Sequence, residues 1–518
     1  MSFFERKLKN RKEKFKQKAS PQNSRSRRAE YNIKISHSKR EMVLMKRRNI
    51  TTTNNSKNEI YIPPLEKLPK LVDVIKNSED TDKIEECTKM IRTMLSVEVD
   101  PPIDQIIETG VVPYFVEFLK DTNNIFLQFE SAWILSNICT GSTDQTSYVV
   151  NLDVIPIFIS LLDSDNNDVI EQSVWALGNI SGDSLTFRDK ILSYPNSFNK
   201  ILSIFHLKEI NESILNNTTW VVSSLCRGVP FAPYHKVKKA LKYFANLCKE
   251  TTTELLINAC WGLSYLSSGN SQQIDDLIST KCLPRVVELI GHKSPDVIIP
   301  ALRTIGNVVT GDSKQTQTAL DCDLLVPLKK LFTHKREQIQ KEACWVLSNI
   351  TAGTRDQIRT IIQGGFIPVL YNLISETKIY TIQKESIWAL SNAVWGGYDE
   401  DIIRLVESGI CEVFDPWLQR RKEYSILKIS LEAYAKILSV GQKISEEEGQ
   451  EHNIYAYKLE RLGVFEHIEK LSNYENQNIK QLVEYLLNTY FYNLQTKVEE
   501  NENNSIDQDE NNDSDYEF

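Results

Sequence analysis

The sequence feature that most constrains this chain is a motif that returns about every 42 residues. Its first two copies read QFESAWILSNICTG and EQSVWALGNISGD, and each lies in an apolar run with helical spacing. The residues at the tryptophan position are Trp133, Trp175, Trp220, Trp261, Arg303, Trp345 and Trp388, at steps of 42, 45, 41, 42, 42 and 43. This period predicts a stack of similar units rather than several independent domains.

A second marker keeps the same period, because a proline precedes each of five tryptophan positions by 18 to 20 residues. These prolines are Pro113, Pro156, Pro284, Pro327 and Pro368. Proline suits the first turn of a helix, where its missing N–H has no intrahelical partner. Each unit is therefore predicted to hold a short helix, a proline-started helix and a longer helix carrying the tryptophan. Glycines are expected to close the long helices, at Gly141, Gly182, Gly228, Gly269, Gly311, Gly353 and Gly396.

Three helices in about 42 residues match the period of armadillo repeats, which must stack on neighbours to bury their apolar faces. Weaker units extend the pattern over residues 80–119 and 425–493. The predicted fold is all-α, a right-handed superhelical solenoid of about ten armadillo repeats over residues 61–495. Its concave side is expected to form a long groove.

The two ends differ in charge from the body. Residues 1–50 hold 17 Lys and Arg against 4 Asp and Glu, a net charge of +13, although the whole chain carries -8. We expect residues 1–60 to form a basic segment that does not fold alone, and residues 496–518 to form an acidic disordered tail. On charge alone, the basic segment could be a nucleic-acid arm, a solvated tail or a segment that folds onto a partner.

The composition argues against several functions. The seven histidines fall in no metal-ligand spacing, and no phosphate-binding loop, GxSxG motif or paired-carboxylate signature is present. We therefore expect no enzyme activity, no metal and no cofactor. The nine cysteines are widely spaced without a CxxC pair, and no apolar run approaches 18 residues. These features predict reduced thiols in a soluble intracellular protein with no membrane segment.

The tryptophans are joined by asparagines four residues later in five copies, at Asn137, Asn179, Asn307, Asn349 and Asn392. For a single helix tryptophan, burial in the core is the commoner interpretation. The repetition of the asparagines argues against burial in the core, because a row of asparagines would be costly to bury without partners. We predict that they are exposed and bind the backbone of an extended peptide, while the indole rings hold the stems of Lys and Arg.

Acidic residues recur in step with the tryptophan positions of the repeat, at Asp183, Asp312, Glu342 and Glu385. Acids near helices are usually solvated surface, so only this phase marks them as candidates for binding basic side chains. The sequence therefore predicts a groove that binds a basic peptide.

Several segments resemble the importin-α family of nuclear-import adaptors, above all EQSVWALGNISGDS, ALRTIGNVVTGD, KEACWVLSNITAG and MKRRNI. The resemblance implies a major site for nuclear localisation signals at Trp133, Asn137, Gly141, Thr146, Gln172, Trp175, Asn179, Asp183 and Trp220. It implies a minor site at Arg303, Asn307, Val309, Thr316, Glu342, Trp345, Asn349, Glu385, Trp388 and Asn392. Two sites on one groove would allow bipartite signals.

The resemblance also assigns the basic segment to importin-β binding, with contributions from Arg25, Arg27, Arg28, Lys39, Arg40, Lys46, Arg47 and Arg48. The last three residues resemble the family's autoinhibitory cluster, which occupies the major site when importin-β is absent. Further implied partners are cargo proteins and the nuclear export receptor for importin-α, with shuttling between cytoplasm and nucleus and no direct nucleic-acid role.

Some positions depart from the family pattern. These are Ser224, Asn258, Ser268, Ser313 and Lys436. They reduce negative charge late in the major site, so we expect Asp183 to carry more of the selectivity. A different function remains open at this point, since an armadillo scaffold that binds other extended peptides without a transport role would share the solenoid. Selection of Lys-rich peptides separates the two.

Overall fold

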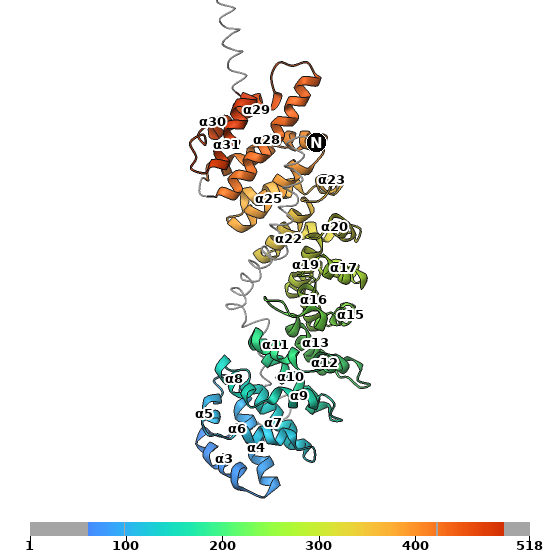
Figure 1. Cartoon of the computed structure of the whole chain (residues 1–518), viewed down its shortest axis with the longest axis vertical. Helices are drawn as coiled ribbons and strands as arrows, with labels where there is room; N and C mark the ends of the chain where they lie inside the picture. The colour runs from blue at the N-terminus through green and yellow to red at the C-terminus, as the bar shows by residue number, and fades with distance from the viewer. Residues whose placement is uncertain (1–60, 98, 421–422, 492–518) are drawn as a thin grey trace, which may run out of the picture. The chain divides into compact units, whose positions relative to one another are not determined.

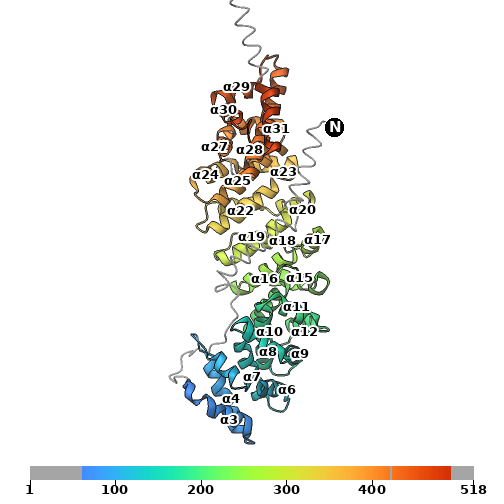
Figure 2. The same cartoon turned by 60° about the vertical axis from the view of Figure 1, so that its left-hand side comes forward.

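A computed structural model describes residues 61–97, 99–420 and 423–491, which form helices joined by short loops, with no strand among them. The chain divides into two compact units, one running to Asn307 and the other beginning at Val308. Figures 1 and 2 label the helices in chain order. Along the described chain the helices group into ten successive units, the first a pair and the other nine triplets, as the repeat period predicts.

The first compact unit opens with the helix pair. Its helices are η1 Leu65–Lys67, α3 Leu68–Asn77 and α4 Thr81–Leu95, then α5 Ile103–Glu108, α6 Val112–Lys120 and α7 Ile125–Ile138, then α8 Thr143–Asn151, α9 Val154–Leu161 and α10 Asn167–Asp183, then α11 Leu185–Ser193, α12 Ser197–Ser203, η2 Ile204–His206 and α13 Glu212–Cys226, then α14 Tyr234–Val237, α15 Ala240–Leu247 and α16 Thr253–Leu266, and lastly α17 Ser271–Ser279, α18 Leu283–Leu289 and α19 Pro295–Val309. The final helix ends just past the boundary between the units.

The second compact unit continues the triplets. Its helices are α20 Ser313–Leu320, α21 Leu325–Leu331 and α22 Glu337–Ile350, then α23 Arg355–Gln363, α24 Ile367–Glu376 and α25 Tyr380–Gly396, then α26 Asp399–Glu407, α27 Ile410–Leu418 and α28 Tyr424–Glu447, and lastly α29 Ile454–Arg461, α30 Val464–Glu469, α31 Gln477–Leu486 and the π-helix η3 Leu487–Phe491.

The prolines lie where the sequence predicts. Pro113, Pro284 and Pro368 occupy the first two positions of α6, α18 and α24. Pro156 and Pro327 are the third residues of α9 and α21. Each proline is therefore in the first turn, where no intrahelical hydrogen bond is lost.

The predicted glycines lie at or near the ends of the long helices, but most do not have the left-handed backbone of a helix cap. Among the seven only Gly228 has it, while Gly182 is the last but one residue of α10 and Gly396 is the last residue of α25. At Gly141, Gly269, Gly311 and Gly353 the space of a Cβ atom is taken by the glutamine side chain four residues later. In three of these cases that glutamine forms a capping box, for example between Ser142 and Gln145 at the start of α8. Glycine is therefore needed to make room for the cap of the next helix.

The core lies between the second and third helices of each unit and between successive third helices. In α10 the predicted stripe of Val174, Leu177 and Ile180 is fully buried. α10 packs against α7 on one side and α13 on the other, and α22 packs against α25. Figures 1 and 2 both show α7 beside α10 and α22 beside α25, and Figure 1 shows α13 next to α10. The third helices therefore form a continuous ladder within each compact unit.

Candidate peptide-binding surface

The predicted site residues follow the third helices. In the first compact unit, α7, α10, α13 and α16 carry Trp133, Trp175, Trp220 and Trp261, and α19 carries Arg303. In the second unit, α22 and α25 carry Trp345 and Trp388. Because successive third helices pack on one another, their tryptophans are brought to neighbouring levels of each ladder.

The asparagines are buried, which corrects the prediction that they are exposed. Their exposed fractions are 6% or less at all five positions. Burial is possible because each side chain has a partner: the Nδ2 group of Asn179 donates to the carbonyl oxygen (3.0 Å) and Oγ (3.2 Å) of Ser136 on α7. A buried amide that makes such bonds avoids the penalty on which the prediction rested.

The same bond recurs along the ladder. Asn137 donates to the carbonyl oxygen of Leu95 (3.3 Å), Asn307 to that of Ser264 (2.8 Å) and Asn392 to that of Ser348 (3.1 Å). Asn349 instead donates to Trp345 within its own helix. In four of the five copies the asparagine therefore ties one third helix to the third helix of the preceding repeat.

The tryptophans are not all displayed. Trp133, Trp175, Trp261 and Trp388 are partly exposed, whereas Trp220 and Trp345 are buried, with exposed fractions of 1% and 6%. A large ring on a closely packed ladder covers its neighbour, so the tryptophans contribute to the core as well as to the surface. The ring of Trp220, for example, fills the space beside Gly178 on α10.

Arg92 completes the first tryptophan level, and the sequence analysis missed it. Its guanidinium lies 4.4 Å from the centre of the Trp133 ring, and its Nε donates to Glu130 Oε2 at 2.8 Å. Both side chains of this ion pair are buried. Arg92 is 41 residues before Trp133, so it holds the tryptophan position of the first unit. Extending the repeat register backwards would have identified it.

Arg303 occupies the equivalent place in the sixth unit and also contacts a tryptophan. Its guanidinium lies 5.4 Å from the centre of the Trp261 ring, and Tyr265 stacks on the same indole with ring centres 5.6 Å apart. Arginine over an indole face is a favourable cation–π geometry. The two arginines at tryptophan positions thus each pair with the tryptophan of an adjacent repeat.

The carboxylate of Asp183 lies at the C-terminal end of α10, where its Oδ1 accepts from Thr143 Oγ1 at 3.4 Å. Nearby, Arg227 donates to the carbonyl oxygens of Ser181 and Gly182. A cation at these carbonyls stabilises the end of the helix. Asp183 therefore accepts one hydrogen bond from α8 and lies at a helix end whose last carbonyls bind Arg227.

The remaining predicted residues of the major site support this framework. Gln172 is buried on α10. Thr146 is buried, and its Oγ1 donates to the carbonyl oxygens of Cys139 and Ser142. Gly141 leaves room for Gln145. Thr146 and Gly141 thus shape the junction between α7 and α8.

In the second unit, Thr316 makes the bonds that Thr146 makes in the first, donating to the carbonyl oxygens of Val309 and Asp312. The carboxylate of Glu385 accepts from Ser348 Oγ at 3.3 Å, so it reaches the preceding third helix. Val309 and Glu342 are buried. The basic residues predicted to bind importin-β, from Arg25 to Arg48, lie outside the described residues.

Comparison with known proteins adds family evidence. The Armadillo/beta-catenin-like repeat family matches residues 100–140, 142–182, 270–310, 312–352 and 354–395, and the Importin beta binding domain family matches residues 11–97. Importin subunit alpha-1b of Oryza sativa is 43% identical over 248 residues, covering 47% of this chain and 45% of the relative. Importin subunit alpha-2 of Arabidopsis thaliana is 39% identical over 298 residues, covering 55% and 54%. The chain belongs to the importin-α family.

The alignments cover about half the length of these importin-α relatives. An engineered protein of known crystal structure shares the fold, with a TM-score of 0.71 at 22% identity, covering 82% of this chain and 98% of the engineered one. The repeat family leaves residues 183–269 unmatched, yet this importin-α chain forms the triplets α11 to α13 and α14 to α16 there. The tryptophan register had already predicted them.

One position that departs from the importin-α pattern, Lys436, forms a local ion cluster. Its Nζ lies 3.0 Å from Asp399 Oδ1, and Lys443 contacts the other oxygen at 2.7 Å. Burial lowers the pKa of Lys436 below its ordinary value, although the bond to Asp399 opposes the shift. In other repeats an asparagine at this position bonds to the preceding third helix. Lys436 instead joins α28 to Asp399 on α26.

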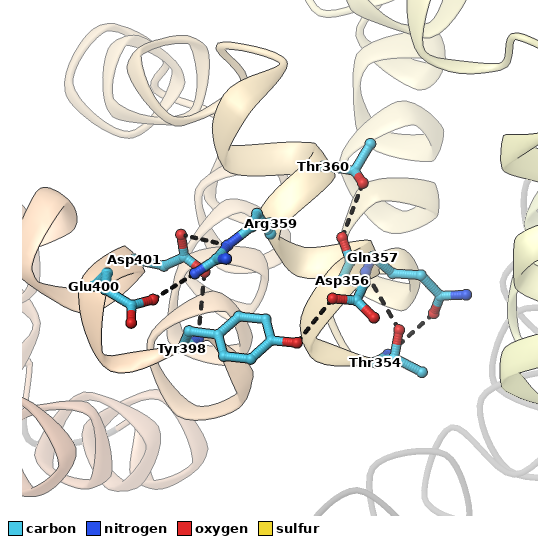
Figure 3. A network of polar contacts seen from close by, with 8 residues as sticks. All are labelled: Thr354, Asp356, Gln357, Arg359, Thr360, Tyr398, Glu400 and Asp401. Carbon is cyan, nitrogen blue, oxygen red and sulfur yellow. Dashed lines mark hydrogen bonds and ion pairs between the residues drawn. The ribbon is translucent and has the colours of Figure 1, made fainter.

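A second polar network links the first helices of two neighbouring repeats, α23 and α26 (Figure 3). Arg359 binds both Asp401 and Glu400, and its guanidinium lies 4.1 Å from the centre of the Tyr398 ring. The Tyr398 hydroxyl donates to Asp356 at 2.8 Å. This network lies on helices that carry none of the tryptophans, so it positions the repeats without adding to the predicted site.

Neither a metal site nor a membrane span is found in the described part of this importin-α chain. Over residues 61–97, 99–420 and 423–491, no group of His, Cys, Asp and Glu could hold a metal ion. In the same ranges no helix is long and apolar enough to cross a membrane.

Proposed function

We propose that the protein is a nuclear import adaptor that binds Lys- and Arg-rich localisation signals along its third helices. Its basic N-terminal segment would link the cargo to importin-β. The observation that carries the proposal is the combination in one chain of an importin-β-binding match and a ladder of third helices that carries the tryptophans, with Asp183 at the end of α10. The proposal includes shuttling between cytoplasm and nucleus and release by the family's export receptor.

The chemistry of the ladder suits a basic peptide. Partly exposed indoles at Trp133 and Trp175 offer faces for the aliphatic stems and charges of Lys and Arg. Asp183 supplies a carboxylate at the end of α10, where an ammonium group would form a charge-assisted hydrogen bond. The asparagines keep successive third helices in register, so that these groups are presented at the repeat spacing.

Autoinhibition is part of the proposal. Lys46, Arg47 and Arg48 would occupy the major site as an internal signal, on a linker of roughly 20 residues that gives a local concentration in the millimolar range. Importin-β would withdraw this segment and expose the surface to cargo. The two ligands would then cooperate through relief of competition.

The test is fluorescence-anisotropy binding of a short Lys-rich peptide to the full chain, to residues 61–518, and to residues 61–518 with Asp183→Lys. Removal of the first 60 residues is expected to tighten binding, and Asp183→Lys to abolish it. Asp165→Lys is the matched control, because Asp165 is an exposed acid in the loop before the same helix. If Asp183→Lys binds as well as Asp165→Lys, the transport role loses its central site and a scaffold role replaces it.

A further inference from the structure

The step of the ladder between α13 and α16 leaves two side-chain donors of α16 without a partner. Among protein atoms of the described chain, Asn258 Nδ2 and Trp261 Nε1 are buried without a hydrogen-bond partner. The Asn258 side chain belongs to a residue that is 4% exposed. Buried donors are nearly always satisfied in folded proteins, so two orphan donors on one helix face need an explanation.

The repeat register brings these groups to one level. Asn258 lies three residues before its tryptophan, as Glu130 and Glu385 do, and both of those carboxylates contact the preceding third helix. The same register turns Asn258 toward α13, which packs directly on α16. Trp261 follows Asn258 by three residues and shares its helix face. We call Asn258 and Trp261 the neutral step.

The charge around the neutral step is positive. Within α13 and α16 the acidic residues are Glu212 and Glu254, both in the first turn of their helices. Arg303 lies over the Trp261 ring. Burial raises the pKa of Tyr265, and the charges of Arg227 and Arg303 act against that rise, so both guanidinium groups are near this tyrosine. A lysine side chain of the peptide would therefore be repelled by the nearby arginines and would find donors rather than acceptors here.

We propose that the neutral step binds a peptide side chain that accepts hydrogen bonds, the carboxylate of Glu or the carboxamide of Gln. The end of α10, by contrast, would bind a lysine. This inference rests on the proposed function and adds a specificity rule to it. Asn258 Nδ2 and Trp261 Nε1 donate to the acceptor oxygen, and the charge of Arg303 favours a carboxylate. A signal that fits this chain carries Lys at one end and an acceptor residue at the level of α16.

The test is a positional scan of the Lys-rich peptide against the full chain, in which each position in turn holds Lys, Gln or Glu. The expected result is one position at which Gln or Glu binds at least as tightly as Lys. Asn258→Asp is expected to reverse the preference at that position toward Lys by about tenfold, because a carboxylate there accepts from an ammonium group. Asn246→Asp adds the same charge at an exposed position on α15 of the same repeat and should leave the scan unchanged.

Trp261→Phe provides a second variant that keeps an aromatic ring but removes the indole N–H donor, and it should weaken binding of the Gln and Glu peptides several-fold relative to Lys. The proposal is overturned if the unmodified chain prefers Lys at every position, or if neither variant changes the scan. If no peptide of the series binds either the full chain or residues 61–518, the proposed function fails together with this inference.

Discussion

The buried pair of Arg92 and Glu130 supports the first tryptophan level, and its removal has a calculable cost. Nε and Oε2 are 2.8 Å apart, with 8% and 3% of the side chains exposed. Glu130→Leu leaves the guanidinium buried without this carboxylate. Breaking one partner of a buried ion pair typically costs about 3–5 kcal/mol. We expect Glu130→Leu to destabilise α7 by an amount in this range.

The double variant Arg92→Met, Glu130→Leu separates charge from packing. Replacing a buried pair by apolar residues of similar volume is often neutral, so the double variant should recover to within about 1 kcal/mol of the unmodified chain. The control is Glu117→Leu, which breaks an exposed pair with Lys120 on α6 and should change stability by less than about 1 kcal/mol.

The assay is amide hydrogen exchange followed by mass spectrometry on peptides from α7. In a stack of repeats each unit couples mainly to its neighbours, so a local measurement resolves the loss better than global unfolding. A cost of about 3 kcal/mol raises the opening equilibrium by roughly a hundredfold. An effect below about 1 kcal/mol for Glu130→Leu, or a double variant as unstable as the single one, would refute the reasoning.

Three further predictions follow from the described contacts. Asn179→Ala removes both bonds to Ser136 and should destabilise the α7–α10 junction by about 1–2 kcal/mol in urea unfolding; no change would show that the tie contributes nothing. Asp276 accepts hydrogen bonds from Lys238 and Tyr234. Burial raises the pKa of Asp276, but these bonds outweigh it and lower the pKa below 3.8. The stability that the bonds provide is therefore present above about pH 4 and lost as pH falls through the folded pKa. Asp276→Asn should flatten this acid limb in a plot of Tm against pH, and an unaltered limb would contradict the assignment. Cys322 is the one partly exposed cysteine among the nine, whereas Cys344 is buried and its burial raises its pKa to about 12. A thiol reagent should therefore label Cys322 first, and Cys322→Ser should remove the fast phase of labelling.

The sequence predicted the local architecture because local rules generate it. Proline in the first turn, apolar spacing along each third helix and a 42-residue register all act within one repeat or between neighbours. These rules extended to the triplets between α11 and α16, which the repeat family does not match, because Trp220 and Trp261 kept the register there. A helix, its cap and its buried stripe need no knowledge of distant partners.

The tertiary structure decided which polar groups are buried and what they bind. Asn179 looks like a surface residue in the sequence because its partner on Ser136 lies 43 residues earlier, and only the packing of α10 on α7 brings the two together. The repeat register could have located Arg92, but only the packing shows that it contacts the Trp133 ring and the Glu130 carboxylate. The reason for a glycine at Gly141 was not predicted, because the glutamine cap that needs its space belongs to the next helix. Spacing along the chain fixes which helices form, but hydrogen bonds between repeats depend on the distance between helices, and packing alone sets that distance.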